Sequence, residues 1–205
     1  MVHRMGIAHV ITVACVLMVG WTSFALGATM SLQEAVNQGK VTMAMKGLGG
    51  STGDVIVITL RRTVPETLRL TLAPGTLLPS ASGTVQDMVA ARVKGERMGP
   101  FTYRPSSTIE LRDNREHDYL VEAYCLDFHK DNPGPADAFQ LGKMDERAKT
   151  ILEAGRKQQV SINVLQSAIW IDREHLSDAT LKRRFPVGDS DIARARALLS
   201  ALSTK

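Results

Sequence analysis

The sequence contains very little cysteine, with only Cys15 and Cys125 in 205 residues. Cys15 lies within the apolar N-terminal stretch and would be lost if that stretch is a cleaved signal. A single remaining cysteine cannot form the disulfide framework typical of small exported domains. Cys125 could therefore form an intermolecular bridge, act as a reactive thiol, or pack as a small buried apolar side chain. The spacing of cysteines leaves these alternatives open.

The chain also lacks dense basic runs, and aromatic residues make up only 5% of it. The formal net charge is +4, and lysines and arginines are scattered among acidic residues. The densest basic cluster, at 182–184, is expected to be a solvated helix face. No CxxC or HxxxH spacing occurs in the sequence, so the common zinc patterns are missing. We therefore expect no nucleic-acid partner, no metal and no cofactor.

A long apolar run occurs only near the N-terminus, from about Ile7 to Trp21, after the positive charge of Arg4. Small residues follow, and they allow cleavage after Gly27 or Ala28. This pattern predicts a signal peptide over residues 1–28, and hence an exported protein in the periplasm, outside the cell or on its surface. The alternative is an uncleaved anchor, because about 20 apolar residues can span a bilayer. Contact with a membrane is expected only through such an uncleaved signal.

The first half of the remaining chain has the short period of β-structure. After a short helix predicted within 29–40, the residues at 41–132 form apolar or alternating runs separated by turn signals. The strand candidates are 41–45, 55–60, 67–72, 85–93, 107–111 and 118–126. Their number and spacing predict an antiparallel β-sandwich. The glycine-rich segment 47–54 is expected to be a hairpin loop, because a strand-like run follows it and a phosphate loop requires a helix there.

The second half, residues 133–205, has a helical period. Pro133, Gly134 and Pro135 interrupt the strand pattern. Beyond them, apolar residues recur at helical spacing in the segments 144–157, 161–175, 177–185 and 190–202. Ser161 is expected to cap the second of these helices. The fold class predicted from both halves is α+β, an antiparallel β-sandwich followed by a small helical subdomain.

Gln166 is a polar residue within an apolar helical stripe. Its neighbours one turn away include Ile162, Ile169 and Trp170. A buried amide without partners costs about 1–3 kcal/mol. On spacing alone, the simpler interpretation is that Gln166 lies at the edge of the stripe and reaches water or a backbone carbonyl.

Two motifs together resemble a known family. The segment "AYCLDFHKDNPGP" at 123–135 and the later "LQSAIW" at 165–170 are similar to the exported Cys–Gln thioester domains of bacterial surface proteins. That family has an aromatic residue and cysteine at a strand end, and Gln-x-Ala-Ile-Trp on a helix. The resemblance covers roughly residues 40–175. The chain differs in having Leu165 where threonine is frequent and Leu126 where a second aromatic residue is frequent.

The resemblance implies that Cys125 and Gln166 form an internal thioester. It further implies that the activated acyl group captures a protein or surface ligand through an amine or hydroxyl. In this picture Tyr124, Ile169 and Trp170 shield the bond from water. His129 could assist proton transfer only if a turn after the cysteine brought it close, and both His129 and His117 are otherwise expected to be solvated loop residues. The reaction is used once per molecule, so the chain is not expected to be an enzyme.

Three alternatives remain from the residues. A Cys–His hydrolase could use Cys125 with His129, His175 and Asp127, although no nucleophile-elbow pattern surrounds the cysteine. A metal site could use His117, Cys125, Asp127 and His129, against the spacing. The main alternative is a non-enzymatic exported β-sandwich that binds a partner and has a buried, inert cysteine.

Overall fold

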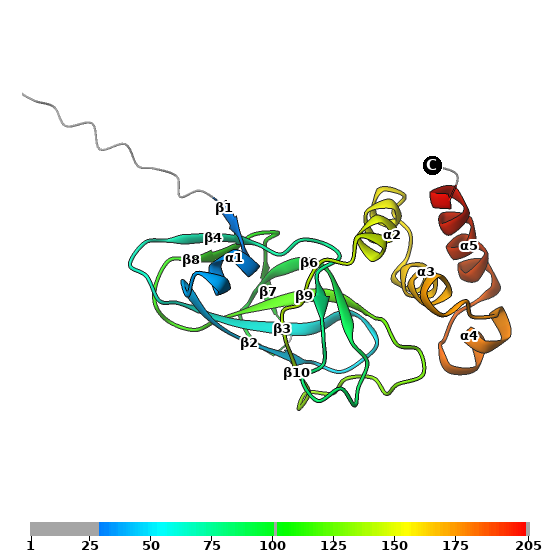
Figure 1. The fold of residues 1–205 in the computed structure, drawn as a ribbon, viewed down its shortest axis with the longest axis horizontal. Helices are drawn as coiled ribbons and strands as arrows, with labels where there is room; N and C mark the ends of the chain where they lie inside the picture. Colours follow the sequence, from blue (N-terminus) through cyan, green and yellow to red (C-terminus); the bar gives the residue numbers. More distant parts are fainter. Residues whose placement is uncertain (1–28, 101, 204–205) are drawn as a thin grey trace, which may run out of the picture.

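The computed structural model of the chain is a mixed α+β fold in which residues 29–100 and 102–203 are described. The described residues form two sheets, of three and seven strands, and five helices (Figure 1). The signal peptide predicted for 1–28 lies outside the described residues. In chain order the elements are β1 (Thr29–Ser31), α1 (Leu32–Asn37), β2 (Val41–Gly47), β3 (Thr52–Arg62), β4 (Leu68–Thr71), β5 (Leu77–Leu78), β6 (Met88–Arg97), β7 (Tyr103–Pro105), β8 (Ile109–Leu111), β9 (His117–Cys125), β10 (Ala138–Phe139), α2 (Glu146–Lys157), α3 (Ile162–Glu174), α4 (Asp178–Arg184) and α5 (Asp189–Ser203).

The larger sheet has the strand order β10-β2-β3-β9-β6-β5, with β7 pairing to β6, and all of its pairs are antiparallel. The glycine-rich segment forms the β2–β3 hairpin, as predicted, and the N–H of Leu48 donates to the carbonyl of Val55 across it. Strand β9 lies at the centre between β3 and β6. Seven consecutive residues of β9, from Tyr119 to Cys125, are buried rather than alternating. Both faces of this central strand are therefore covered, which the alternating pattern of a half-exposed strand does not anticipate.

The smaller sheet has the order β1-β4-β8. Strand β1 pairs with β4 in parallel, so the predicted all-antiparallel arrangement is wrong for this pair. The short helix predicted over 29–40 is present as α1, but Thr29–Ser31 before it forms β1. The hydroxyl of Ser31 accepts the N–H of Glu34 and caps α1. One apolar core contains residues of both sheets and of the helices, including Leu32, Leu70 and Ile109.

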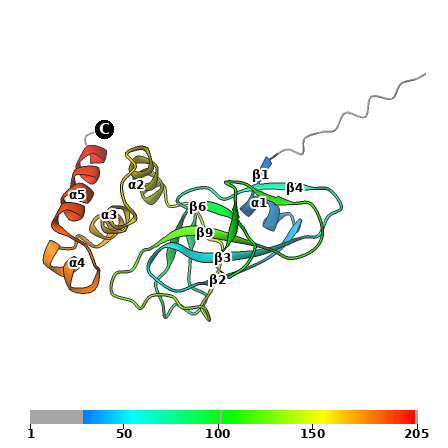
Figure 2. The same ribbon diagram turned by 180° about the vertical axis from the view of Figure 1, so that it is seen from behind.

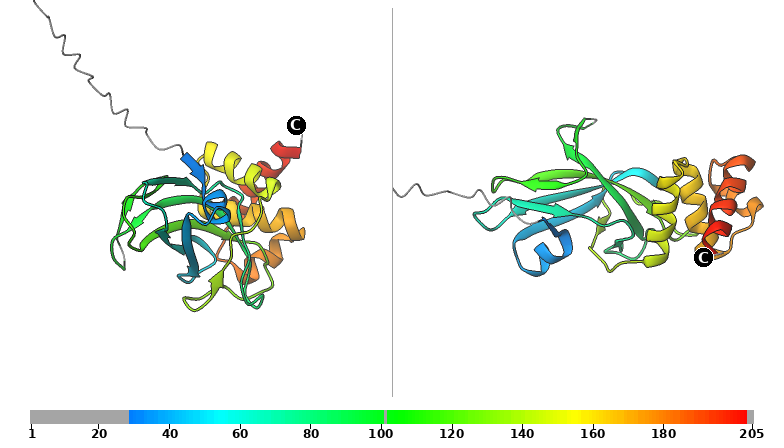
Figure 3. Two further views of the ribbon diagram at one scale, coloured as in Figure 1. Left: turned by 60° about the vertical axis from the view of Figure 1, so that its left-hand side comes forward. Right: turned by 90° about the horizontal axis from the view of Figure 1, so that it is seen from above.

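The four later helices gather at one end of the molecule, far from β1 and α1 (Figures 2 and 3). Three of them begin at side-chain caps, Asp145, Ser161 and Ser177, and the cap predicted at Ser161 is confirmed. The predicted boundary at residue 133 is too early for the helical part. The chain first adds β10 to the edge of β2, and the first of these helices begins at Glu146.

His117 is not the solvated loop residue that its spacing predicted. It begins β9, and its side chain is only 14% exposed. Its Nδ1 lies 2.7 Å from Glu96 Oε1 and its Nε2 lies 2.8 Å from Asp113 Oδ1. Burial by itself would lower the pKa of His117, but the hydrogen bonds to Glu96 and Asp113 outweigh burial and raise that pKa above its ordinary value.

The raised pKa of His117 predicts a pH-dependent contribution to stability. A histidine whose pKa is higher in the folded state stabilises the protein fully below its unfolded pKa, and this contribution is lost as the pH rises through the folded pKa. We expect His117→Gln to destabilise the protein at about pH 6 and to cost progressively less toward about pH 8. Urea unfolding of both proteins across this range measures the difference. A difference that does not change with pH would contradict the paired, charged histidine.

Candidate functional site

The structure brings Cys125 and Gln166 into direct contact. Cys125 ends β9, Gln166 lies near the middle of α3, and both residues are 0% exposed. The backbone N–H of Cys125 donates to Gln166 Oε1 at 3.0 Å, and Gln166 Nε2 donates to the backbone carbonyl of Cys125 at 2.8 Å. The two residues are 41 positions apart in the chain, so only the packing of α3 against the end of β9 brings them together. Cys125 is a free thiol in the structure.

The amide of Gln166 makes the two backbone hydrogen bonds with Cys125 that a neighbouring strand would make if the β3–β9 pairing continued. The β3–β9 pairing ends at Thr52 opposite Tyr124, and beyond it the N–H of Cys125 also donates to the carbonyl of Ser51 at 3.1 Å. The carbonyl of Cys125 is buried and takes its hydrogen bond from Gln166. Leaving such a group unpaired would cost about 1–3 kcal/mol. The amide does reach a backbone carbonyl, as its spacing allowed, but it lies inside the core rather than at the solvent edge.

A second tether holds the chain after β9 along α3. The N–H of Phe128 donates to Glu174 Oε1 at 2.6 Å, and Glu174 is the last residue of α3. His129 Nε2 lies 3.4 Å from the other carboxylate oxygen of Glu174. The two contacts, at Gln166 and at Glu174, fix the strand end against the helix at separated points. No local pattern in the sequence pointed to Glu174, because its partner is the backbone N–H of a residue 46 positions earlier in the chain.

The thiol of Cys125 is in an apolar setting. Its Sγ lies 3.3 Å from the sulfur of Met88, which is opposite Cys125 in the β6–β9 pairing and is also fully buried. Burial raises the pKa of the Cys125 thiol well above its ordinary value, and the negative charge of Asp127 adds to the rise. The thiol is therefore neutral at pH 7 and a poor nucleophile toward external reagents.

The residues expected for a Cys–His hydrolase are not arranged as one. His129 is 69% exposed and is directed to Glu174, and His175 caps the end of α3 in a left-handed conformation. Asp127 accepts the N–H of Asp87 at 2.9 Å and pairs with Lys130 at 3.4 Å. Within the part of the chain that the structure describes, no histidine contacts the thiol, and no cluster of three or more possible ligands could hold a metal ion.

Aromatic side chains close the helical side of the pair. Trp170, one turn after Gln166, is 3% exposed and packs edge-on against Phe128 at 5.0 Å and Phe185 at 5.1 Å between ring centroids. Ile169 is 1% exposed. A cavity of about 110 Å³ borders this cluster, with Ser51, Phe128 and Trp170 among its walls. Ile169 and Trp170 are thus buried as the expected shell requires, whereas the exposed His129 reaches the cluster only by an edge contact of its ring with Phe128.

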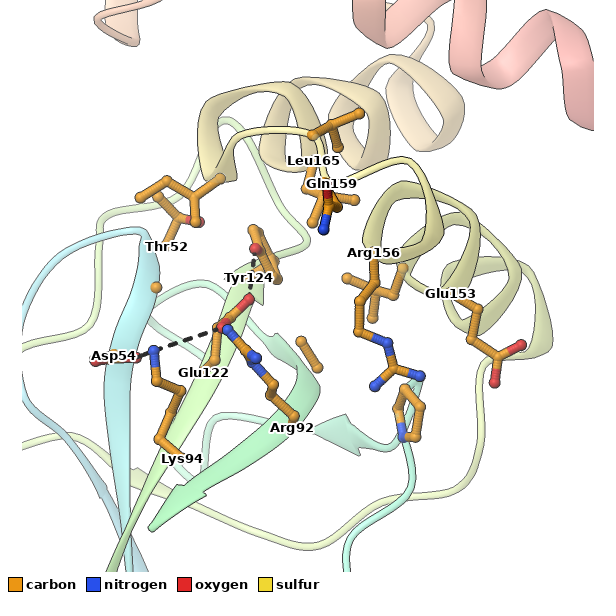
Figure 4. Close-up of a pocket in the computed structure, with 16 residues that line it drawn as sticks. Thr52, Asp54, Arg92, Lys94, Glu122, Tyr124, Glu153, Arg156, Gln159 and Leu165 are labelled. Carbon is orange, nitrogen blue, oxygen red and sulfur yellow. Dashed lines mark hydrogen bonds and ion pairs between the residues drawn. The ribbon is translucent and has the colours of Figure 1, made fainter. Parts of the chain in front are cut away.

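Tyr124 faces the other way. Successive side chains on a strand point to opposite faces, so Tyr124 lies on the face opposite Cys125. Its hydroxyl donates to Glu122 Oε1 at 2.9 Å, and both residues line a cleft of about 670 Å³ (Figure 4). Trp170, one turn after Gln166, therefore lines the small cavity. Tyr124 and Leu165, which directly precede Cys125 and Gln166, line the larger cleft.

No family model, no curated protein sequence and no solved structure matches this chain. None of the helices among the described residues is both long enough and apolar enough to cross a membrane. The function is therefore inferred from the residues of the site itself.

Proposed function

We propose that this chain is an exported module, with the two sheets packed as a sandwich and a helical subdomain, that forms an internal Cys125–Gln166 thioester and captures a partner covalently. The observation that supports it most strongly is the hydrogen bond from the Cys125 N–H to Gln166 Oε1. It polarises the one side-chain carbonyl in contact with the residue that carries the only described thiol. Both residues also occupy the positions of the two motifs that resemble thioester domains.

Bond formation would proceed by attack of Cys125 Sγ on Gln166 Cδ. The Cδ–Nε2 bond breaks, and the nitrogen leaves as ammonia with the thiol proton. Negative charge develops on Oε1 in the intermediate, where the Cys125 N–H already donates, as in an oxyanion hole. Holding the reacting groups together can contribute about 7–11 kcal/mol toward the barrier. This contribution offsets the low nucleophilicity of a neutral thiol.

In the capture step, the Cys125 sulfur would act as the leaving group rather than as the nucleophile. An amine or hydroxyl of the partner attacks Cδ, the Sγ–Cδ bond breaks, and the sulfur leaves with the proton of the attacking group. The products are an amide or ester that joins the partner to Gln166, and a free Cys125 thiol. Water must be kept out until the partner arrives, and the buried cluster of Phe128, Trp170 and Phe185 serves this purpose.

Intact-mass analysis tests the bond directly. We expect the purified protein to be lighter than its sequence mass by about 17 Da, the mass of ammonia, and its cysteine to resist alkylation after unfolding. Incubation with methylamine is expected to open the bond, add the amine and release an alkylatable thiol. Cys125→Ala is the control, and it should have its full sequence mass and take up no methylamine. Full mass in the unsubstituted protein, with a thiol that is alkylated on unfolding, would refute the proposal.

The second candidate is non-covalent binding by a fold in which Cys125 and Gln166 are only structural. Two observations favour it. Both ends of the Gln166 amide already have backbone partners, so its burial needs no covalent bond. Burial also raises the pKa of the thiol, which makes the unbonded cysteine inert. The mass measurement separates the two candidates, because the second requires the full sequence mass.

A further inference from the structure

We infer that the small cavity beside Trp170 receives a hydroxymethyl group of the captured partner, so that the product of capture is an ester rather than an amide. The inference rests on the proposed function, since it names the nucleophile that opens the thioester. The cavity has a volume of about 110 Å³. This is several times the share of about 30 Å³ that one water molecule has in the liquid, so a hydroxyl and the carbon that carries it can fit.

The cavity lies where four parts of the chain meet. Ser51 comes from the β2–β3 hairpin, Gln86 from the segment before β6, Phe128 from the segment after β9, and Trp170 from α3. The backbone N–H of Gln86 donates to the carbonyl of Asp131 at 3.0 Å, which holds Gln86 against the segment after β9. The cavity therefore exists only in the assembled fold.

Two polar groups of the residues that line the cavity are buried and have no hydrogen-bond partner within the described chain. One is the acceptor Oε1 of Gln86, and the other is the donor Nε1 of Trp170. The other end of the Gln86 amide is already used, because its Nε2 donates to Asn132 Oδ1 at 3.0 Å. A buried polar group without a partner is destabilising, so a ligand that pairs with both groups would be bound favourably.

A hydroxyl is the nucleophile that can pair with both groups. Its O–H can donate to Gln86 Oε1, and its oxygen can accept from the Trp170 N–H. An ammonium group has three donors and no acceptor, so it would leave the indole N–H unpaired. A carboxylate has no donor, and it would leave Gln86 Oε1 unpaired. The cavity therefore favours an alcohol over a protonated lysine or an acid.

The charged groups around the cavity also disfavour another cation. Lys130, Asp131 and Arg184 line it, so there are two cations and one carboxylate, and Lys130 is paired with Asp127 at 3.4 Å. The guanidinium carbon of Arg184 lies over the Phe128 ring, 5.6 Å from its centre. The aromatic face that could attract an ammonium group therefore already has a cation. A neutral hydroxyl meets no such repulsion.

The cavity adjoins the proposed thioester without opening onto it. The carbonyl of Ser51 accepts the N–H of Cys125, and Trp170 lies one turn after Gln166. Cys125 and Gln166 are both 0% exposed, and neither of them lines the cavity. A water molecule in the cavity is therefore separated from Gln166 Cδ. The larger hydroxymethyl group would reach Cδ by displacing the Trp170 ring, and this step would distinguish the partner from water.

Capture by a hydroxyl balances without a further reagent. The hydroxyl oxygen forms a bond to Gln166 Cδ, and the Cδ–Sγ bond breaks. The hydroxyl proton goes to the sulfur, which leaves as the Cys125 thiol. The products are an ester at position 166 and a free thiol.

Hydroxyl binding can be measured without the thioester, in the full chain with Cys125→Ala. Trp21 and Trp170 are the only tryptophans, so Trp21→Phe leaves a single indole N–H in the ¹⁵N-labelled protein. We expect its NMR resonance to shift saturably when ethanol is added, and to stay unchanged with ethylammonium chloride at equal ionic strength. Gln86→Leu should weaken ethanol binding by about threefold or more, because one of the two hydrogen bonds is lost. The absence of a saturable shift, or an equal shift with ethylammonium, would overturn the inference.

Capture is followed by intact mass in the protein that retains Cys125. The probes are N-acetylserinamide and methyl glucoside, which carry the hydroxymethyl group on a peptide unit and on a sugar, together with methylamine. We expect at least one of the alcohols to add to the protein, and the faster one identifies the source of the partner's hydroxyl. Gln86→Leu should slow ester formation by about threefold or more and change methylamine addition by less than about twofold.

Asn132→Ala is the matched control, because it removes the hydrogen bond at Gln86 Nε2 and keeps the acceptor Oε1. It is expected to change ester formation by less than about twofold. The Gln86→Leu protein should still be lighter than its sequence mass by about 17 Da, which would show that it folds and forms the bond. Addition of neither alcohol, or equal slowing of ester and amide formation by Gln86→Leu, would overturn the inference. A full sequence mass in the unsubstituted protein would instead refute the thioester, and the ethanol titration would still decide whether the cavity binds a hydroxyl.

Discussion

Gln166→Glu is expected to lower the free energy of unfolding by about 3–5 kcal/mol at pH 7. The substitution keeps the shape of the side chain and the acceptor that faces the Cys125 N–H. It replaces the Nε2 donor by an oxygen that faces the buried carbonyl of Cys125, which donates nothing. A charged carboxylate there has no cation partner, and a protonated one is favoured instead. Urea unfolding in the Cys125→Ala background measures this cost without any contribution from a cross-link.

The sign of the pH dependence separates this explanation from a simple packing defect. The pKa of the introduced carboxyl would be raised in the folded protein, so the folded state binds more protons than the unfolded state. The penalty is then absent below the unfolded pKa of about 4.3 and grows as the pH rises above it. The control is Gln140→Glu at an exposed position, expected to stay within about 0.5 kcal/mol. A penalty at Gln166 that is equal at low and neutral pH would contradict the hydrogen-bonded amide.

Trp170→Ala is expected to destabilise the protein by about 3–5 kcal/mol. The indole is 3% exposed and lies between Phe128 and Phe185, so its removal leaves a cavity beside the Cys125–Gln166 pair. Water that enters this cavity would hydrolyse the proposed thioester and leave glutamate at position 166. We therefore expect the species that is lighter by about 17 Da to be lost faster in the variant, as followed by intact mass over time.

Trp170→Phe is the matched comparison. It keeps an aromatic ring between Phe128 and Phe185, and it removes an indole N–H that is buried without a hydrogen-bond partner among the described residues. Because no hydrogen bond is lost, we expect a cost well below that of the alanine variant, about 1–2 kcal/mol. Equal destabilisation by phenylalanine and alanine would show that the aromatic packing is not what stabilises this region.

Much of the fold could be predicted because it follows from local patterns. The β-branched run at 55–60 forms part of β3, and Ser161 caps α3 through the N–H of Val164. The hairpin at 47–54 was predictable because a strand rather than a helix follows its glycines. The parallel β1–β4 pair and the late return of the chain as β10 were not predictable. Both pairings join segments that are far apart in the sequence, and the residues of β1 and β10 carry no pattern that identifies the partner strand.

The candidate site shows the same division. The two motifs identified Cys125 and Gln166, and the apolar stripe identified Ile169 and Trp170 as their buried neighbours. Nothing near His117 in the sequence indicated its contact with Glu96, which belongs to β6, although its second partner, Asp113, is only four residues away. The contact of Cys125 with Met88 also requires the assembled fold.

The sequence by itself determined the strand-type spacing of apolar residues in the first half and their helical spacing in the second. It also determined most of the caps and turns, and the chemistry available at positions 125 and 166. These features depend on residues within about one turn or one hairpin of each other. Only the tertiary structure decided that the end of β9 leaves a buried carbonyl without a strand partner, and that the amide of Gln166 fills that place. The physical reason is that a buried polar group must be paired. Which group pairs with it is determined by the packing of α3 against the sheet, and no local pattern in the chain encodes that packing.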